Sequence, residues 1–268
     1  MATLRRGDKG EAVKRLQRAL KKAGFLPGKI DGEFGGGTEA ALLAFQHSEG
    51  LLADGIAGAR TLQALGLDGP QDALPDVLPG VTVQVVSGMF PFTPVGNIID
   101  NLPTVCGGLK AHGLTEKPLI LMALATIRAE TESFTPVGEG RSRFNTSPRG
   151  HDFDLYDFRK DLGNQGPPDG ERFRGRGYIQ LTGRFNYGRY SKILGLGDLL
   201  LTQPEKASDP DVAGQLLAVF LKDKERAIKE ALMDNDLRQA RRLVNGGSHG
   251  LDRFTDAFQR GEKLLPEG

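Results

Sequence analysis

The sequence is poor in the residues that build disulfide and metal sites, with one cysteine, four histidines and no tryptophan among 268 residues. Cys106 alone cannot form an intrachain disulfide or a multi-cysteine zinc site, and a lone cysteine is more typical of a small buried apolar residue than of a nucleophile. No His-Glu-x-x-His pair is present, and the cluster at residues 151–154 is only weakly similar to a ligand set. The sequence therefore predicts no metal and no cofactor.

The chain also lacks a charge excess and long apolar runs. With 35 Lys and Arg against 34 Asp and Glu, the net charge is +1, so no global field favours nucleic acid or an anionic membrane. The most apolar segment, residues 118–129, has the length of a buried helix, whereas a membrane span needs about 18 apolar residues. No apolar run follows the basic pair near the start, so we expect no signal peptide. We predict neither a nucleic-acid partner nor stable membrane insertion.

What is present is an ordinary globular composition, 38% hydrophobic and 26% charged, in a chain long enough for two domains. The pattern Asp31-Gly32-x-Phe-Gly-x-x-Thr38 recurs 23 residues later as Asp54-Gly55-x-Ala-Gly-x-x-Thr61. Asp-Gly predicts a turn, and each threonine is placed to cap the helix that follows. A helical pattern also ends at Gly24. Residues 1–65 thus predict a small three-helix bundle.

Residues 66–81 have the composition of a linker, with proline, glycine and aspartate but no Lys or Arg. Beyond it, the domain at residues 82–268 is predicted to be mainly α. Helical patterns cover residues 97–109, 118–131, 211–233 and 237–243, and only residues 81–86 suggest a strand. The aperiodic stretch 134–176 is of a length that is usually functional or disordered.

Three glutamates at the end of the apolar helix are the strongest catalytic candidates. A carboxyl group that leaves a buried helix into a polar cleft, as Glu130 does, is where desolvation favours the protonated form of a general acid. Glu139, on the following loop, can reach the other side of a cleft and stay ionised, and glycoside hydrolysis needs such a pair. Glu132 is the alternative second carboxylate. Spacing alone is equally consistent with the alternative that all three glutamates are solvated residues at a helix end.

Residues 173–188 combine glycines with uncharged polar side chains, which suit sugar hydroxyl and acetamido groups. An Arg- and Gly-rich surface loop is the other interpretation, which the interleaved apolar residues disfavour. The predicted substrate-binding residues of this segment are Arg176, Tyr178, Gln180, Asn186 and Tyr187.

The pattern Gly175-Arg-Gly-Tyr-Ile-Gln-Leu-Thr-Gly-Arg-Phe-Asn-Tyr-Gly188 resembles the signature of glycoside hydrolase family 19, which includes plant-type chitinases and phage endolysins. Ala129-Glu130-Thr131 is similar to its His-Glu-Thr motif, with alanine in place of histidine. Residues 244–247 are similar to its substrate-contacting Asn-Gly-Gly motif, which implies that Asn245 is also a substrate-binding residue. The resemblance implies a lysozyme-like α-helical fold and inversion, with Glu130 as the general acid. It also implies that Glu139 is the base and that Thr182 holds the attacking water.

Residues 4–65 resemble the three-helix peptidoglycan-binding module of cell-wall hydrolases. The resemblance rests on Leu4-Arg-Arg-Gly-Asp-Lys-Gly10, on the first copy of the Asp-Gly pattern and on Phe45-Gln46. It implies targeting to the wall, with Asp31, Gly32 and Asp54 as candidate contacts, although these residues are equally suited to making turns only.

Together the two resemblances predict an endolysin that hydrolyses the glycan strand of bacterial peptidoglycan. The expected protein is a monomer that stays in the host cytoplasm until its release to the periplasm and the wall. A lytic transglycosylase or a chitinase on the same fold, and a wall-binding protein without catalysis, are the alternatives.

Overall fold

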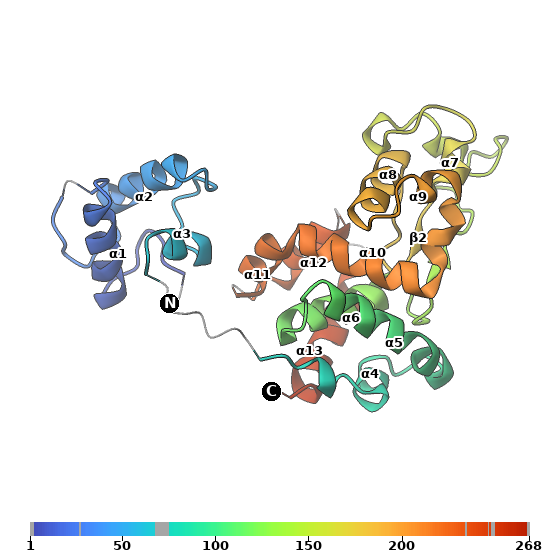
Figure 1. Cartoon of the computed structure of the whole chain (residues 1–268), viewed down its shortest axis with the longest axis horizontal. Helices are drawn as coiled ribbons and strands as arrows, with labels where there is room; N and C mark the ends of the chain where they lie inside the picture. Colours follow the sequence, from blue (N-terminus) through green and yellow to red (C-terminus); the bar gives the residue numbers. More distant parts are fainter. Residues whose placement is uncertain are drawn as a thin grey trace. The chain divides into compact units, whose positions relative to one another are not determined.

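The computed structural model describes residues 3–266 except 27, 68–74, 234, 246, 248 and 249. The chain divides into two compact units, Met1–Leu74 and Pro75–Gly268 (Figure 1). Residues 68–74, in the middle of the predicted linker, lie outside the described residues. Its last part does not act as a linker, because Val77 and Val81 are buried in the core of the second unit and Val77 N donates to Thr115 O at 3.0 Å. The second unit therefore begins before residue 82.

The first unit is a bundle of three helices, α1 (Glu11–Lys22), α2 (Gly36–Ser48) and α3 (Ala59–Ala64). Its core gathers leucines at helical spacing in α1, Leu16 and Leu20, with Leu42 and Phe45 of α2. The predicted stop after α1 is present, because Gly24 adopts a φ of +85° that favours glycine. The predicted three-helix bundle is confirmed.

The second unit is built from helices joined by long loops. Its longer helices are α4 (Val83–Met89), α5 (Val95–Ala111), α6 (Lys117–Glu130), α8 (Arg184–Ile193), α10 (Pro210–Asp223), α11 (Glu225–Met233), α12 (Leu237–Asn245) and α13 (Leu251–Leu264). The single turns are α7 (Asp169–Arg172) and α9 (Leu199–Thr202), with 3-10 turns at Leu78–Gly80, Asp154–Tyr156, Lys160–Leu162 and Pro204–Ser208. Strand β1 (Val137–Gly138) pairs antiparallel with β2 (Arg176–Gly177).

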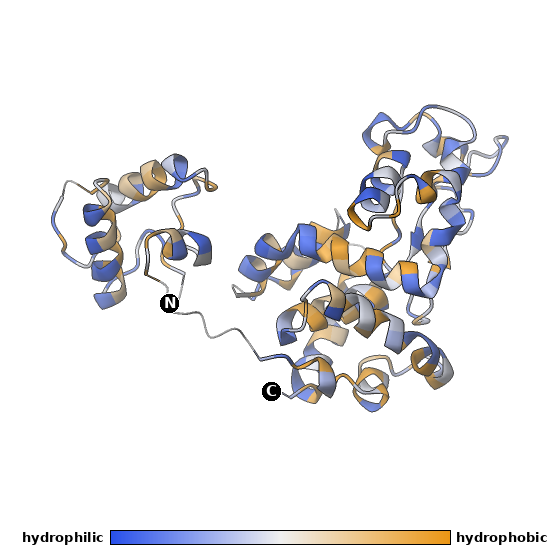
Figure 2. Cartoon of the chain, viewed as in Figure 1, coloured by the Kyte–Doolittle hydropathy of each residue, from blue (hydrophilic) through white to orange (hydrophobic). Residues whose placement is uncertain are grey.

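Helix α6 forms the centre of this unit, since every residue from Leu119 to Ala129 is buried. Helices α10, α11, α12 and α13 all contact it, and Figure 2 shows the apolar residues gathered on the helices while the loops are largely polar. Helices α5 and α10 approach closely where two glycines meet: a Cβ on Gly108 would lie 2.3 Å from Gly214 O. The buried helix therefore ends, at Glu130, inside a packed scaffold.

Two sequence-based element predictions are wrong. Residues 81–86 do not form a strand, because the Thr82 hydroxyl accepts from Val85 N and begins α4, which buries Val86 and Met89. The helix predicted over residues 211–233 is interrupted at Lys224, between α10 and α11. Helices α5 and α6 match their predicted segments to within two residues, and the mainly α class is confirmed.

Candidate active site

Glu130 ends α6 with a carboxyl group that is only 11% exposed and is paired with a buried cation. Its Oε1 accepts from Nη2 of Arg241 at 2.8 Å. Arg241, in α12, is fully buried and lies 6.0 Å from the centre of the Phe254 ring. No described residue donates to Oε2 of Glu130. Oε2 is therefore the Glu130 oxygen that remains available to a ligand, and the role of Glu130 as general acid stays a prediction.

Gly250, just before α13, packs against the end of α6. A Cβ on Gly250 would lie 3.0 Å from Ala129 O, and the small Ala129 side chain is itself buried. Asn245 is half-buried and follows Arg241 by four residues, so both lie on one face of α12. The structure thus brings Asn245 to the Glu130 end of the site, while Gly246 of the same motif lies outside the described residues.

Glu139 is held by three donors from two sides. Its Oε1 accepts from Asn145 Nδ2 and from the Tyr156 hydroxyl, each at 2.9 Å, and its Oε2 accepts from Gly175 N at 3.0 Å. Its own backbone N donates to Gly175 O at 2.7 Å, beside the β1–β2 pair. The carboxylate is therefore fixed in orientation, and Oε2 keeps one lone pair for a further donor.

Two of these donors, Asn145 and Tyr156, were not predicted. Asn145 is fully buried, and its amide is saturated because Oδ1 also accepts from Ser142 N and the Thr146 hydroxyl. Burial, reinforced by the neighbouring Glu139 charge, raises the pKa of Tyr156 to about 12, so the phenol remains a donor at neutral pH. Both residues lie in an aperiodic loop, where spacing carries no signal.

Gly175 allows Glu139 and Gln180 to lie close together. A Cβ at this position would lie 2.8 Å from Gln180 Oε1 and 3.1 Å from Glu139 Oε2. Gln180 has a φ of +50° and donates to Val137 O and Gly177 O, both at 3.0 Å. A side chain at residue 175 would displace these two side chains, so Gly175 leaves room for the three donors Asn145, Tyr156 and Gly175 N around Glu139, here called the Glu139 cradle.

Thr182 and Asn186 extend this group. The Thr182 hydroxyl donates to Gln180 O, and Asn186 Nδ2 donates to Thr182 O, each at 2.8 Å. The side chains of Gln180, Thr182 and Asn186 are half-buried. Gln180, Thr182 and Asn186 thus lie along one segment, which Gly175 links to Glu139. The roles of these four residues toward substrate and water stay predictions.

Three predicted substrate-binding residues are instead part of the core. Tyr178 and Tyr187 have no exposed surface, and Arg176 is 6% exposed. Tyr178 donates to Asn101 Oδ1 at 3.3 Å, while Arg176 donates to the Tyr187 hydroxyl, which donates to Arg174 O. Burial raises the pKa of both tyrosines to about 12. The prediction that they contact substrate is corrected: their side chains lie in the core and fix residues 173–188 to it.

Glu132, the alternative second carboxylate, lies in the turn after α6 and faces a different partner. Its Oε2 pairs with Arg253 Nη1 of α13 at 3.1 Å. Glu132 and Phe134 both have positive φ, 45° and 56°, which is uncommon for residues other than glycine. The buried Phe134 ring packs edge-on to Phe90 with centroids 5.0 Å apart. The turn that separates Glu130 from Glu139 in the chain is therefore anchored in the core by Phe134.

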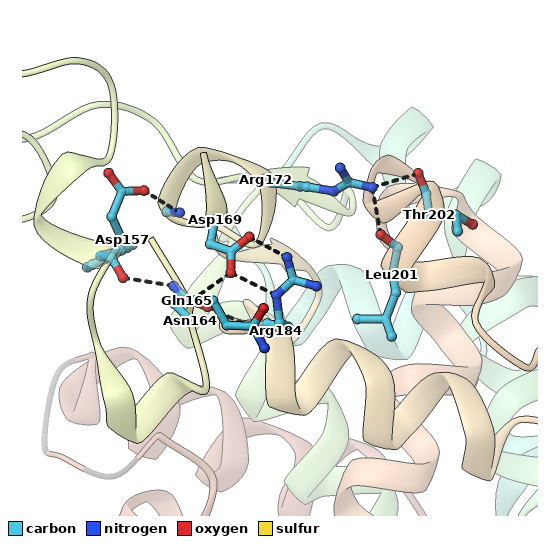
Figure 3. Close-up of polar contacts among 10 residues, drawn as sticks. Asp157, Asn164, Gln165, Asp169, Arg172, Arg184, Leu201 and Thr202 are labelled. Carbon is cyan, nitrogen blue, oxygen red and sulfur yellow. Dashed lines mark hydrogen bonds and ion pairs between the residues drawn. The ribbon is translucent and has the colours of Figure 1, made fainter. Parts of the chain in front are cut away.

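An ion pair between the buried Asp169 and the half-buried Arg184 supports the loop that carries Tyr156 (Figure 3). Arg184 donates from Nε and Nη2 to the two oxygens of Asp169, at 2.7 and 2.6 Å. Burial alone would raise the pKa of Asp169, but the bonds from Arg184 and Gln165 N lower it on balance. Asn164 accepts from Arg184 N and donates to Tyr156 O at 2.8 Å. The network thus reaches the Glu139 cradle.

In the described part of the chain, no three His, Cys, Asp or Glu side chains are grouped as a metal site would require. Burial raises the pKa of the Cys106 thiol to about 11, which disfavours the thiolate that a cysteine nucleophile needs. Among the same residues, no helix combines the length and apolar character of a membrane span.

In the first unit, the first Asp-Gly turn is organised by a buried glutamine. Gln17 Nε2 donates to Asp31 Oδ1 at 2.8 Å and to the Thr38 hydroxyl at 3.0 Å, and Gln17 Oε1 accepts from Gly32 N. Hydrogen bonding by Gln17 lowers the pKa of Asp31. Asp31 and Gly32 therefore have a structural role, and their contact with the wall stays a prediction.

The second turn repeats this arrangement. Gln46 Nε2 donates to Asp54 Oδ1 at 2.9 Å and to the Thr61 hydroxyl at 3.2 Å, and its Oε1 accepts from Gly55 N. Neither Thr38 nor Thr61 caps its helix, because each lies inside it and accepts from the glutamine. The capping prediction is corrected: the repeat encodes a glutamine-centred turn.

Residues 9–65 match the family model described as "Putative peptidoglycan binding domain". A spore cortex-lytic enzyme of Bacillus cereus is 53% identical over 62 residues, which are 23% of this chain and 24% of that protein. The chain thus spans about a quarter of the length of the curated relatives it matches first. The similarity to these relatives is confined to a segment of the size of the first unit.

A Haemophilus influenzae protein with a glycosyl hydrolase family 19 domain is 35% identical over 99 residues, 37% of this chain and 45% of that protein. Chitinase C from Streptomyces griseus superimposes with a TM-score of 0.50 at 20% identity, covering 74% of this chain and 79% of that one, and shares the fold. The resemblance predicted from the motifs is confirmed: the chain joins a peptidoglycan-binding domain to a mainly α unit similar to glycoside hydrolase family 19.

Proposed function

We propose that this chain is a peptidoglycan hydrolase of the endolysin type, which binds the wall through its first unit and cuts the glycan strand with its second. One observation carries the proposal: a wall-binding domain precedes a family 19-like unit in which one carboxyl group ends a buried helix and another is held by three donors. The environments of these groups are unlike, as an acid and a base require.

In the proposed reaction, Oε2 of Glu130 donates its proton to the leaving glycosidic oxygen while Oε1 stays bonded to Arg241. Glu139 accepts a proton from water at Oε2, whose free lone pair remains after the bond from Gly175 N. The hydroxide so formed attacks the anomeric carbon from the opposite face, which inverts its configuration. Thr182 helps to hold this water. The step consumes one water and transfers one proton at each carboxyl group.

Peptidoglycan is the macromolecular partner in this proposal, and the chain acts as a monomer without nucleic acid or stable membrane insertion. Because such an enzyme damages the wall of the cell that makes it, we place it in the host cytoplasm until release to the periplasm. Fractionation before lysis tests this: activity already in the periplasm would contradict it.

The direct test compares outer-membrane-stripped cells with purified chitin. We expect loss of turbidity with the cells and new reducing ends from purified wall. Activity on chitin alone would favour the chitinase alternative, to which the fold likeness to chitinase C lends support. An anhydro product would indicate a lytic transglycosylase, and binding without cleavage would indicate a wall-binding protein.

The role of the first unit is tested by deleting residues 1–65. The truncated protein should pellet less with purified sacculi but cleave soluble glycan oligomers within a few fold of the full chain. An isolated first unit that fails to pellet would refute targeting.

A further inference from the structure

The loop at residues 141–152, here called the basic loop, begins two residues after Glu139. It contains Arg141, Arg143 and Arg149 against a single acidic residue, Asp152, whereas the whole chain is balanced in charge. All three arginines are exposed. Arg141 pairs with Asp152 at 3.1 Å, but no described carboxylate lies within ion-pair distance of Arg143 or Arg149. Two guanidinium groups in the loop that follows the candidate base therefore lack an acidic partner in the described protein.

Nine of the sixteen arginines in the second unit face a carboxylate among the described residues, and Arg143 and Arg149 do not. The nine are Arg128, Arg141, Arg159, Arg184, Arg189, Arg226, Arg241, Arg253 and Arg260. The guanidinium of Arg143 instead stacks at 4.9 Å from the centre of the exposed Phe144 ring. Stacking on a ring leaves the N–H groups at the edge of the guanidinium available to a ligand.

The basic loop is held firmly rather than loosely tethered. The buried Asn145 bonds Glu139 directly, and Ser147 donates from N and Oγ to the two oxygens of Asp154, at 2.7 and 2.5 Å. Gly150 permits a tight turn, since a Cβ there would lie 1.9 Å from Asp154 Oδ2. Arg143 is two residues and Arg149 four residues from Asn145, distances that a chain spans with at most about 7 Å and about 14 Å. Because Asn145 bonds Glu139, the backbone of both arginines lies within a few sugar lengths of Glu139.

The chemistry of a guanidinium indicates the ligand. Arginine binds carboxylates through paired N–H donors, and neutral sugar rings offer no such group. Peptidoglycan differs from chitin by carboxylate-bearing peptides attached to alternate sugars. We infer that Arg143 and Arg149 bind peptide-stem carboxylates beside the bond that is cut, and so select peptidoglycan over uncharged glycans. This inference rests on the proposed function.

The test combines a double variant with chemical removal of the substrate charge. Full-length R143Q/R149Q and wild type act on native sacculi and on sacculi whose carboxyl groups have first been amidated with carbodiimide and ammonium. Release of reducing ends is measured at substrate levels below saturation. A matched control, K110Q/K192Q, removes two exposed lysines that have no acidic partner among the described residues.

We expect R143Q/R149Q to lose about tenfold in rate on native sacculi, as two exposed ion pairs would give. Amidation should slow the wild type by the same factor and leave the double variant unchanged, while K110Q/K192Q behaves as wild type. An unchanged rate on native sacculi, or an equal loss on amidated sacculi, would overturn the inference and leave the hydrolase intact. A wild type inactive on both preparations would overturn the proposed function, and the inference with it.

Discussion

Glu130 and Glu139 are the same residue type in opposite surroundings. Glu130 has one charged partner, Arg241, which is 111 residues away in sequence and fully buried, and one of its oxygens has no described donor. Glu139 has three uncharged donors, Asn145, Tyr156 and Gly175, and the most distant of them is 36 residues away in sequence. The scaffold therefore gives two identical side chains unlike surroundings, which the proposed division into an acid and a base requires.

The largest expected effect comes from Glu130→Gln. An amide has no proton to transfer, so activity should fall by 10²- to 10⁴-fold. The same change removes the counter-charge of the buried Arg241, so we also expect a loss of about 2 kcal/mol in the free energy of unfolding. Rates are therefore compared at a temperature where circular dichroism reports both proteins folded. A folded Glu130→Gln variant with near-normal rates would exclude Glu130 as the acid.

Glu139→Gln should be nearly as severe, because nothing then accepts the proton of the attacking water. Azide distinguishes the two carboxyl groups, since it is a nucleophile that needs no deprotonation. It should partly restore turnover of Glu139→Gln, with a glycosyl azide as product, and should not restore Glu130→Gln. Rescue of the Glu130 variant alone would reverse the two roles.

A smaller effect is expected from Tyr156→Phe, which removes one of the three donors that position Glu139. Loss of a hydrogen bond to a charged group is worth about 1.5 kcal/mol, or roughly tenfold, and should lower kcat with little change in KM. The control is Tyr190→Phe, whose hydroxyl donates to Asp223 of α10 instead. Equal losses in both variants would mean that a general packing defect, and not the orientation of Glu139, is responsible.

The smallest effect should follow Glu132→Gln, because this side chain pairs with Arg253 at a half-exposed position. Such pairs contribute about 1 kcal/mol or less to stability, and we expect activity within a few fold of wild type. Reducing-end assays on the same wall preparation measure it. An inactive Glu132 variant beside an active Glu139 variant would transfer the role of base to Glu132.

The sequence predicts that the buried helix α6 ends near Glu130, because residues 118–129 form an apolar segment of helix length and Glu130 is the first carboxylate after it. It predicts the Glu139 cradle only through the glycine-rich segment at residues 173–188. Asn145 and Tyr156 could not be predicted, since they come from an aperiodic loop whose shape depends on pairs formed in the folded chain, such as Asp169 with Arg184 (Figure 3). Arg241 reaches Glu130 only through tertiary packing.

Errors arise where one residue type serves two purposes. Tyr178 and Tyr187 alternate with polar residues in a segment suited to sugars, but aromatic rings fill a core equally well, and both are buried. Thr38 and Thr61 look like caps, yet each accepts from a glutamine that lies in the preceding helix. A local pattern cannot reveal such a distant partner.

The configuration of the first product tests the division of roles between Glu130 and Glu139 most directly. Proton NMR can follow the anomeric signal of the new reducing end during the first minutes of hydrolysis of a β-linked soluble glycan oligomer. A base that activates water on the opposite face predicts the α anomer as the initial product. An initial β anomer, or an anhydro sugar without a reducing end, would contradict the account.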